Sequence, residues 1–359
     1  MKIKFKMHHF KNLYIFFAIL ALIIFFFSTT KVNAKAFQIN NIEISTPFEK
    51  NFSKNKVIDI GFKEAFLELL NSIIQTKDLK KIDEIKLSEI KSMIESFSIK
   101  EEKFVKEIYY MNLGVSFDKK KIYNYLEKKN IFPAQIISET FLFIPIIIDE
   151  KNENLVIFSD NQFYNNWNKF NKKSQLINYL LPTEDLEDLN LIKSKSNIIE
   201  NYDFKEIIKK YFLNHYIISL IFMNNEQTKV LSKIYIKDKI FIKNDSFKKI
   251  NLKNENEVEF LINQLKVIYE DQWKEFNQIN TSIKLPLFIR VSNKDLTLSL
   301  KFEKTLEQID LIDNFSIDKF DKDHIFYEVI FNGTPNNFIR LMKEKNYKFD
   351  TQKKIWILK

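Results

Sequence analysis

The chain of 359 residues contains no cysteine and only three glycines. Without cysteine it cannot form a disulfide, a thiolate metal site, a cysteine nucleophile or a lipid-modified N-terminal cysteine. The glycines are Gly61, Gly114 and Gly333, and none lies near another in the sequence. This spacing excludes a dinucleotide-binding fingerprint, a phosphate-binding P-loop and a nucleophile elbow, because each of these motifs needs clustered glycines.

Arginine is almost as scarce, since only Arg290 and Arg340 are present. The formal net charge is +9, but residues 1–34 hold five lysines and no acid, so the remaining chain carries only +4. Lysine and glutamate are interspersed in that remainder. Nucleic-acid interfaces favour arginine forks within a clustered basic face, so we expect no nucleic-acid partner. The sequence also shows no cofactor motif, and we expect no cofactor.

The N-terminus has the three parts of a secretory signal. Residues 1–12 are basic, residues 13–27 form an unbroken apolar run of 15, and Val32 and Ala34 stand at positions −3 and −1 of a small-residue site. This pattern is typical of a signal peptide. We therefore predict a signal peptide over residues 1–34, cleavage after Ala34 and a periplasmic mature protein.

An uncleaved inner-membrane anchor is the alternative interpretation of the same segment. As a helix, the apolar run would span roughly 22 Å, which is short of the roughly 30 Å of a bilayer's hydrocarbon core. Ser28–Thr30 would have to complete the span, with the basic side kept inside. Cleavage agrees better with the length and the small-residue site, but both interpretations place the rest of the chain outside the cytoplasm.

Length and hydrophobic periodicity predict an α+β protein of three small modules. The first module, residues 37–130, has the predicted order βααββα. Its predicted elements are a strand at 37–45, a helix at 54–75, a helical stretch at 82–97, strands at 98–106 and 108–117, and a helix at 119–129. Gly61 inside the helix is either a tolerated defect or the site of a close contact between helix and sheet. We expect Gly114 to form a bulge.

The second module, residues 140–282, is predicted to be a mixed sheet with helices packed on it. Residues 141–148 are continuously apolar, as in a central strand covered on both faces. The third module, residues 284–359, has the order βαββαβ, which is ferredoxin-like. Within it, Ser292 and Asp295 resemble a capping box that opens a helix to about Gln308, although the leucines from 296 onward also fit a strand period. Thr334 and Pro335 form a second helix start.

Few side chains are suited to catalysis. After removal of the signal only His215 and His324 remain, and both lie among apolar residues of predicted strands. A catalytic triad or a multi-histidine metal site needs more imidazole than this, so we interpret both as structural and predict no catalytic residue and no metal ligand.

Acidic residues gather at two places. Glu184, Asp185, Glu187 and Asp188 would suit a cation or a sugar hydrolase only if they converged. We interpret them instead as the first turns of a helix capped by Thr183, where acids complement the helix dipole. Asp149, Glu150 and Asp160 flank the loop after the central strand, where ligands bind in open α/β sheets. Loops are polar by default, so the favoured interpretation is that they are ordinary loop acids, and binding of a cation or polar ligand is the alternative.

Tryptophan occurs three times. Trp273 and Trp356 stand in register with apolar neighbours and are predicted to be core residues. Trp167 has polar neighbours and is the one most expected to be exposed as a binding anchor. Asp149, Asp160 and Trp167 are therefore the candidate ligand-binding residues.

Several segments together resemble a known secreted bacterial family, the domain-of-unknown-function family 2066 in its alphaproteobacterial form. They are the signal, residues 41–70, Ile144-Pro145-Ile146, Trp167, residues 182–189 and residues 333–356. The second module also resembles the N-terminal domain of TolB and the activator lipoproteins of penicillin-binding proteins. The first is similar in element order to the N-terminal domain of the flagellar T-ring protein. These resemblances imply a non-enzymatic envelope scaffold and carry over no site residues.

We therefore expect an adaptor or scaffold that binds other envelope proteins. One alternative is a carboxylate-dependent envelope hydrolase acting on glycan. Another is an adaptor anchored in the inner membrane through residues 13–27.

Overall fold

The computed structural model describes residues 36–82, 84–171, 173–294 and 296–359. The predicted signal peptide, its apolar run and the predicted cleavage site at Ala34 lie outside these residues. Phe37–Lys359 form one compact unit. Within the described part of the chain, no helix is both long enough and apolar enough to span a membrane.

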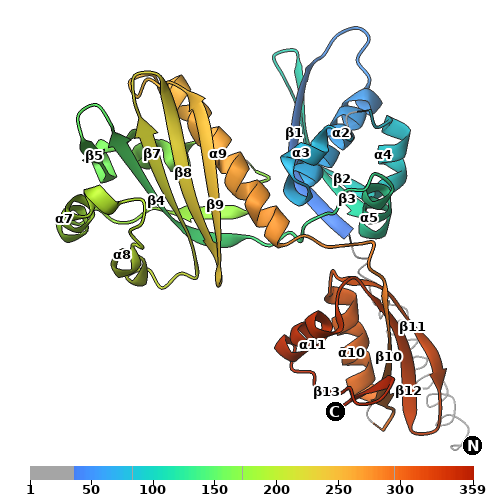
Figure 1. Cartoon of the computed structure of the whole chain (residues 1–359). Coiled ribbons are helices and arrows are strands. Elements are labelled where there is room, and N and C mark those ends of the chain that lie inside the picture. Colours follow the sequence, from blue (N-terminus) through green and yellow to red (C-terminus); the bar gives the residue numbers. More distant parts are fainter. Residues whose placement is uncertain (1–35, 83, 172, 295) are drawn as a thin grey trace, which may run out of the picture. The chain divides into compact units, whose positions relative to one another are not determined.

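The α+β class is confirmed, because helices alternate with three separate sheets (Figure 1). The first sheet has the strand order β1-β3-β2, formed by β1 (Ala36–Pro47), β2 (Ile94–Val105) and β3 (Ile108–Asp118). Its helices are α2 (Lys54–Ile73), α3 (Thr76–Leu79), α4 (Leu87–Met93) and α5 (Lys119–Lys128).

Of the two interpretations of Gly61, the structure favours the close contact between helix and sheet. A Cβ atom at this position of α2 would lie 2.6 Å from Cδ1 of Ile44 on β1 and 2.8 Å from Cδ2 of Leu113 on β3. Both distances are shorter than van der Waals contact, so the helix can approach the sheet this closely only because the residue has no side chain.

Two predictions for the first sheet are wrong. The helical stretch expected at 82–97 ends at Met93, and the chain continues as the long strand β2. The register shifts lie in β2, where Glu95 and Lys100 are the extra residues, whereas Gly114 on β3 pairs regularly with Ser98. Since the bulges bend β2 and not β3, Gly114 has no bulge to form.

The middle sheet has six strands. The order is β5-β4-β7-β8-β9, and β6 also pairs with β4. The strands are β4 (Glu139–Asp149), β5 (Asn154–Val156), β6 (Ile177–Leu180), β7 (His215–Met223), β8 (Gln227–Ile236) and β9 (Lys239–Lys248). β4 runs parallel to β7 and is buried from Phe141 to Ile147, as a central strand must be.

Helices cover both faces of the middle sheet (Figure 1). The long α9 (Glu255–Phe276) and the short α6 (Gln162–Asn166) pack on one face with Phe141, Phe143 and Ile147. On the other face, α7 (Leu186–Ser194) and α8 (Lys205–Lys209) pack against Leu142 and Ile144.

The third sheet confirms the ferredoxin-like prediction. Its order is β11-β12-β10-β14-β13, with β10 antiparallel to β12 and parallel to β14. The elements are β10 (Leu285–Ser292), α10 (Leu296–Gln308), β11 (Ile312–Phe320), β12 (His324–Phe331), α11 (Pro335–Glu344), β13 (Phe349–Asp350) and β14 (Ile355–Leu358). Residues 296–308 are helical, and the Thr334 side chain caps α11 as predicted.

The three predicted modules do not each have a separate hydrophobic core. Side chains around the first and third sheets belong to one hydrophobic cluster, which includes Leu69, Leu113, Ile289 and Phe302. An ion pair between Lys119 and Asp310 links the same two parts of the chain. The predicted boundaries near 130, 140, 282 and 284 remain predictions.

Candidate functional site

Trp167 is not the exposed anchor that its polar neighbours suggest. Its side chain is 0% exposed, and its ring stacks on Phe143 with 3.8 Å between centroids. Tyr179 meets it edge-on at 5.4 Å, and the Lys266 ammonium lies 5.5 Å from its ring centroid. A fully enclosed indole cannot contact a ligand from solvent, so Trp167 is a core residue.

The asparagines around Trp167 explain why its surroundings looked polar. Asn161 caps α6 by accepting hydrogen bonds from the backbone N–H groups of Phe163 and Tyr164. Asn165 and Asn168 donate from their side-chain amides to the carbonyl oxygens of Ser159 and Tyr179. These amides satisfy local backbone groups, so their presence does not indicate exposure.

The two candidate carboxylates have different surroundings. Asp149 closes the loop after β4, since its carboxylate accepts from the N–H of Lys151 at 3.1 Å and from the Asn152 side chain at 2.6 Å. The bond from the Asn152 side chain is the main cause that lowers the pKa of Asp149. Asp160 is exposed at the end of the 3-10 turn Phe158–Asp160. Among the described residues, no contact joins Asp149, Asp160 and Trp167 to one another.

The acidic cluster at 184–188 lies at the start of a helix, as predicted. The predicted cap, Thr183, is wrong, because the residue that caps the helix lies two positions later. Asp185 caps α7 by accepting from the N–H of Glu187 at 2.8 Å. Thr183 makes no such bond, and its N–H donates instead to the hydroxyl of Tyr211. The sequence contains two acceptable caps, and the fold selects the one whose charge also meets Lys210.

Lys210 bridges the two acids of this helix start. Its ammonium lies 2.9 Å from Asp185 and 2.8 Å from the buried Asp188. The hydrogen bond from Lys210 is the main cause that lowers the pKa of Asp185. These contacts bind the cluster to a lysine, and they provide no support for the hydrolase alternative.

Neither histidine lies in a catalytic arrangement. His215 is buried between the rings of Phe141 and Trp273, and its Nδ1 accepts from the N–H of Lys237 at 3.3 Å. Burial lowers its pKa, which keeps the ring neutral. His324 begins β12 beside Asp321, whose carboxylate accepts from the His324 N–H at 2.8 Å. In the described parts of the chain, no group of three or more His, Asp or Glu side chains is placed to hold a metal ion.

Several buried charged side chains with shifted pKa values lie at a cleft beside α9. The sequence did not predict this cleft. The cavity has a volume of about 120 Å³. It is lined by polar side chains from α2, α3, α9 and the segment before β6: Asn71, Thr76, Ser174, Gln175, Asn263, Lys266, Glu270 and Lys274, together with Val267.

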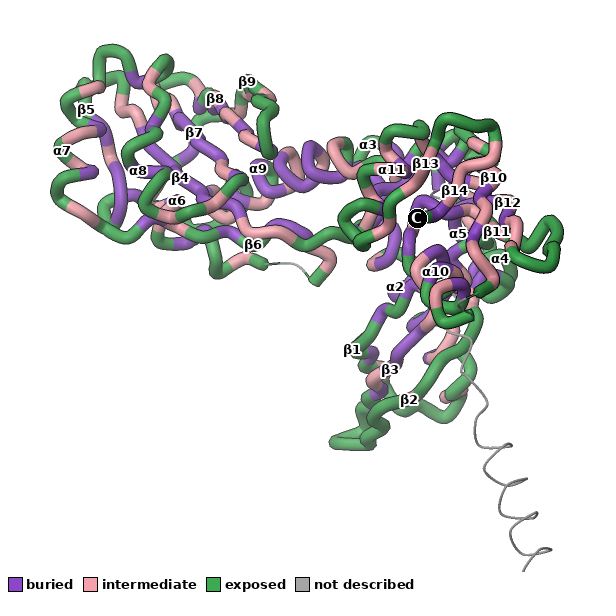
Figure 2. Tube along the Cα trace, turned by 90° about the horizontal axis from the view of Figure 1, so that it is seen from below, coloured by how far each residue is buried: buried purple, intermediate pink, exposed green. Residues whose placement is uncertain are grey.

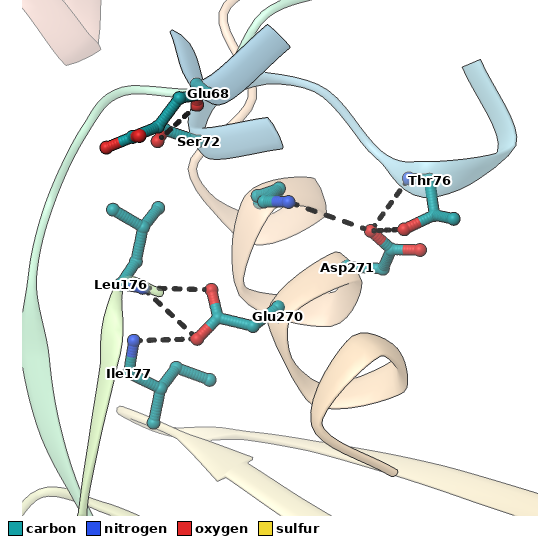
Figure 3. A network of polar contacts seen from close by, with 8 residues as sticks. Glu68, Ser72, Thr76, Leu176, Ile177, Glu270 and Asp271 are labelled. Carbon is teal, nitrogen blue, oxygen red and sulfur yellow. Dashed lines mark hydrogen bonds and ion pairs between the residues drawn. The ribbon is translucent and has the colours of Figure 1, made fainter. Parts of the chain in front are cut away.

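Two buried charges of this cleft serve the backbone. Glu270 accepts from the N–H of Ile177 at 2.8 Å and of Leu176 at 3.1 Å (Figure 3). Lys266 donates to the carbonyl oxygens of Trp167 and Phe170 and to the side chain of Asn171, at 2.7 to 2.9 Å. Both groups hold the segment that leads into β6 against α9.

The next two charges join α9 to α3. Asp271 accepts from the N–H of Thr76 at 2.9 Å and from its hydroxyl at 3.2 Å (Figure 3). The ammonium of the buried Lys274 lies 4.0 Å from the same carboxylate. Burial raises the pKa of Glu270 and of Asp271 and lowers that of Lys274. Perturbed groups in a cleft can mark a site, but Glu270 already binds backbone N–H groups and Lys274 is already paired with Asp271.

This cleft was not predicted, because the charged residues of α9 have the spacing expected for the solvent-exposed face of an amphipathic helix. Lys266, Glu270 and Lys274 recur at every fourth position, directly beside the apolar stripe of α9. Such a row at the border of the stripe is a usable signal, since a second element can cover it.

A different surface gathers exposed apolar side chains at the end of the β2–β3 hairpin. We call Phe48, Phe104, Val105 and Ile108 the hairpin tip. Their side chains are 48%, 58%, 47% and 36% exposed. Phe48 and Phe104 meet edge-on at 4.7 Å, and Figure 2 shows the exposed course of β2.

The turn fixes the geometry of the hairpin tip. Lys106 and Glu107 both have positive φ, as in the two-residue turns that suit a hairpin's twist. Val105 and Ile108 are therefore paired directly across the turn. The N–H of Phe48 donates to the carbonyl oxygen of Glu107 at 2.7 Å, which ties the end of β1 to the turn. The tip is thus an ordered surface.

Neither a scan against models of protein families nor a search of curated proteins finds a match to this chain.

Proposed function

We propose that this protein is a non-catalytic adaptor of the bacterial cell envelope and that it binds another envelope protein through the hairpin tip. The observation that carries the proposal is the exposure of four large apolar side chains around an ordered hairpin turn, in the pairs Phe48 with Phe104 and Val105 with Ile108. Contiguous apolar surface that remains exposed is favoured at protein–protein interfaces, because a partner removes it from water.

The hairpin tip has the properties of an interface centre. Aromatic side chains are enriched at such centres, and Phe48 and Phe104 already support each other. The tip also rests on the core of the first sheet through the partly buried Phe52, whose ring centroid lies 4.7 Å from that of Phe48 and 4.8 Å from that of the buried Tyr109. A preformed apolar surface loses little conformational entropy when a partner covers it.

The test is site-specific photo-crosslinking in cells, with the crosslinker at Phe104 of the full-length protein. We expect one or two reproducible protein adducts in the envelope fraction. The double variant Phe104→Ser, Val105→Ser should reduce co-purification of that partner at least tenfold. Leu186→Ser is the matched control, because Leu186 is 74% exposed on α7, and it should leave co-purification unchanged.

Three results would contradict the proposal: no protein adduct at Phe104, equal co-purification with both variants, or adducts to lipid alone. Circular dichroism of each variant checks that the fold is retained. The alternatives of an inner-membrane anchor and a cleaved signal concern residues outside the described part of the chain. The intact mass of the envelope-bound protein distinguishes them.

A further inference from the structure

The strand β9 is a terminal strand of the middle sheet. β8 pairs with it along all ten of its residues. On its other side, no backbone hydrogen bond to another described segment is present. A long strand with free N–H and C=O groups can pair with a strand of another chain. Figure 1 shows β9 as the last strand of its sheet, next to β8.

The side chains of β9 divide into two unlike faces. Phe241 and Phe247 pack toward the cluster beneath α9. On the opposite face Ile240 is 55% exposed and Ile242 is 60% exposed. β9 carries charges of the kind that protect an unpaired edge, at Lys239, Lys243, Asp245 and Lys248, but the two isoleucines still leave apolar surface exposed beside them.

Asp245 adds an unsatisfied group to the same strand. One of its carboxylate oxygens, Oδ2, is buried and has no hydrogen-bond donor in the described structure. Burial raises the pKa of this carboxyl. Lys243 lies two residues before it on the same face of the strand, and its charge lowers this pKa by less than burial raises it. A buried carboxylate oxygen without a donor is costly, which favours a partner that supplies a cation.

We propose that two copies of this chain associate by antiparallel pairing of their β9 strands about Asn244. In this register Lys243 of each copy faces Asp245 of the other, and Phe241 faces Phe247. The two middle sheets then form one continuous sheet with α9 of both copies on the same side. This inference does not depend on the hairpin tip.

Charge selects this register among its neighbours. A two-fold pairing keeps the faces of the strands matched only when the axis passes through a residue. An axis at Lys243 would set two lysines opposite each other, and an axis at Asp245 would set two aspartates opposite each other. Directly opposed like charges destabilise a strand pair, whereas opposite charges and aromatic pairs stabilise it.

An axis at Ser246 would pair only residues 244–248. An axis at Ile242 is the remaining neighbour. It would pair only residues 239–245, whereas the axis at Asn244 pairs residues 240–248. It would also set Lys243 against Phe241, and Asp245 against Lys239. The register about Asn244 therefore has the longer ladder. In this register Asp245 faces Lys243, whereas in the register about Ile242 it faces Lys239, so the two registers can be distinguished by which lysine matters.

The experiment is sedimentation equilibrium of the protein as purified from the envelope, over about 1–200 μM. A single strand pair is a small interface, so we expect a dimer dissociation constant on the order of 10⁻⁵ M. Lys243→Asp and Asp245→Lys should each weaken dimerisation at least tenfold. The double variant Lys243→Asp, Asp245→Lys should restore it, because the charges are exchanged and the pairs remain.

Lys239→Asp is the matched control, since it makes the same charge change on the same strand outside the proposed ladder, and it should dimerise like the parent protein. A parent protein that stays monomeric at 200 μM would overturn the inference. So would a double variant that stays as weak as the single variants. An effect of Lys239→Asp equal to that of Lys243→Asp would overturn the proposed register.

Discussion

Trp167 stabilises the middle part of the chain by filling space between a sheet and a helix. Its ring lies against Phe143, Tyr179 and Tyr269, and none of the four side chains is more than 8% exposed. We expect Trp167→Ala to lower the free energy of unfolding by about 3–5 kcal/mol, through lost burial and the cavity left behind. Urea denaturation followed by circular dichroism measures this loss.

The control for this prediction is Trp167→Phe, which keeps a ring over Phe143 and should lose less than half as much. If Trp167→Ala unfolds at the same urea concentration as the parent protein, the indole is not a core residue.

Glu270 should give the stability of the protein a distinct pH dependence. Burial raises the pKa of this carboxyl above its ordinary value of 4.5. Between the two values the folded protein binds more protons than the unfolded chain, so the free energy of unfolding falls as the pH rises through this window. Glu270→Gln cannot titrate, and we expect it to remove part of that fall. Urea denaturation at a series of pH values above 4.5 measures the difference.

Glu275→Gln is the control for Glu270, because Glu275 is exposed on the same helix. The parent protein and Glu275→Gln should show parallel pH profiles, whereas Glu270→Gln should show a flatter one. Three parallel profiles would contradict the raised pKa of Glu270.

At the scale of elements, α2 depends on the missing side chain at Gly61. Gly61→Ala should gain about 1 kcal/mol from helix propensity but lose about 1–3 kcal/mol from overpacking against Ile44 and Leu113. Both neighbours are at most 5% exposed and have little room to move, so we expect a net loss of stability of about 1 kcal/mol. Thermal and urea denaturation measure the net effect.

The variant Ile44→Val tests the cause of that loss. It removes Cδ1, the atom that would lie 2.6 Å from the new Cβ. Gly61→Ala should therefore cost less in the Ile44→Val background than in the parent protein. Equal costs in the two backgrounds would show that overpacking against Ile44 is not the reason.

At the scale of the whole molecule, one carboxylate connects distant parts of the chain. Asp271 on α9 accepts from the backbone N–H of Thr76, the first residue of α3. Asp271→Ala leaves this N–H without its acceptor, so we expect its hydrogen exchange to become at least tenfold faster. A loss of about 1–2 kcal/mol in unfolding free energy should accompany it, as for a lost helix cap. Residue-resolved hydrogen exchange measures the first effect.

Glu275→Ala, one turn further along α9, controls for a general loosening of that helix and should leave exchange at Thr76 unchanged. If exchange at Thr76 does not respond to Asp271→Ala, the bond across 195 residues of sequence is not what protects that amide.

The candidate site was harder to predict than the fold, because the burial and hydrogen-bond partners of single side chains depend on segments that are distant in the sequence. Hydrophobic periodicity located the long helices, the central strand β4 and the βαββαβ order, because those patterns reflect which face is buried. The polar neighbours of Trp167 predicted exposure wrongly, because asparagine can bond to nearby backbone as readily as to water. The charges of α9 were missed because the segment that covers them lies about 90 residues away in the sequence.

The sequence by itself determined the class of fold, the ferredoxin-like element order and the cap at Thr334. All of these depend on local spacing, side-chain size and backbone preference. Only the tertiary structure decided that Trp167 is buried, that Asp185 caps α7, that Glu270 and Asp271 hold distant backbone, and that β9 is left as an open edge. Those outcomes depend on which distant segments meet, because burial and hydrogen-bond partners are properties of the packed chain.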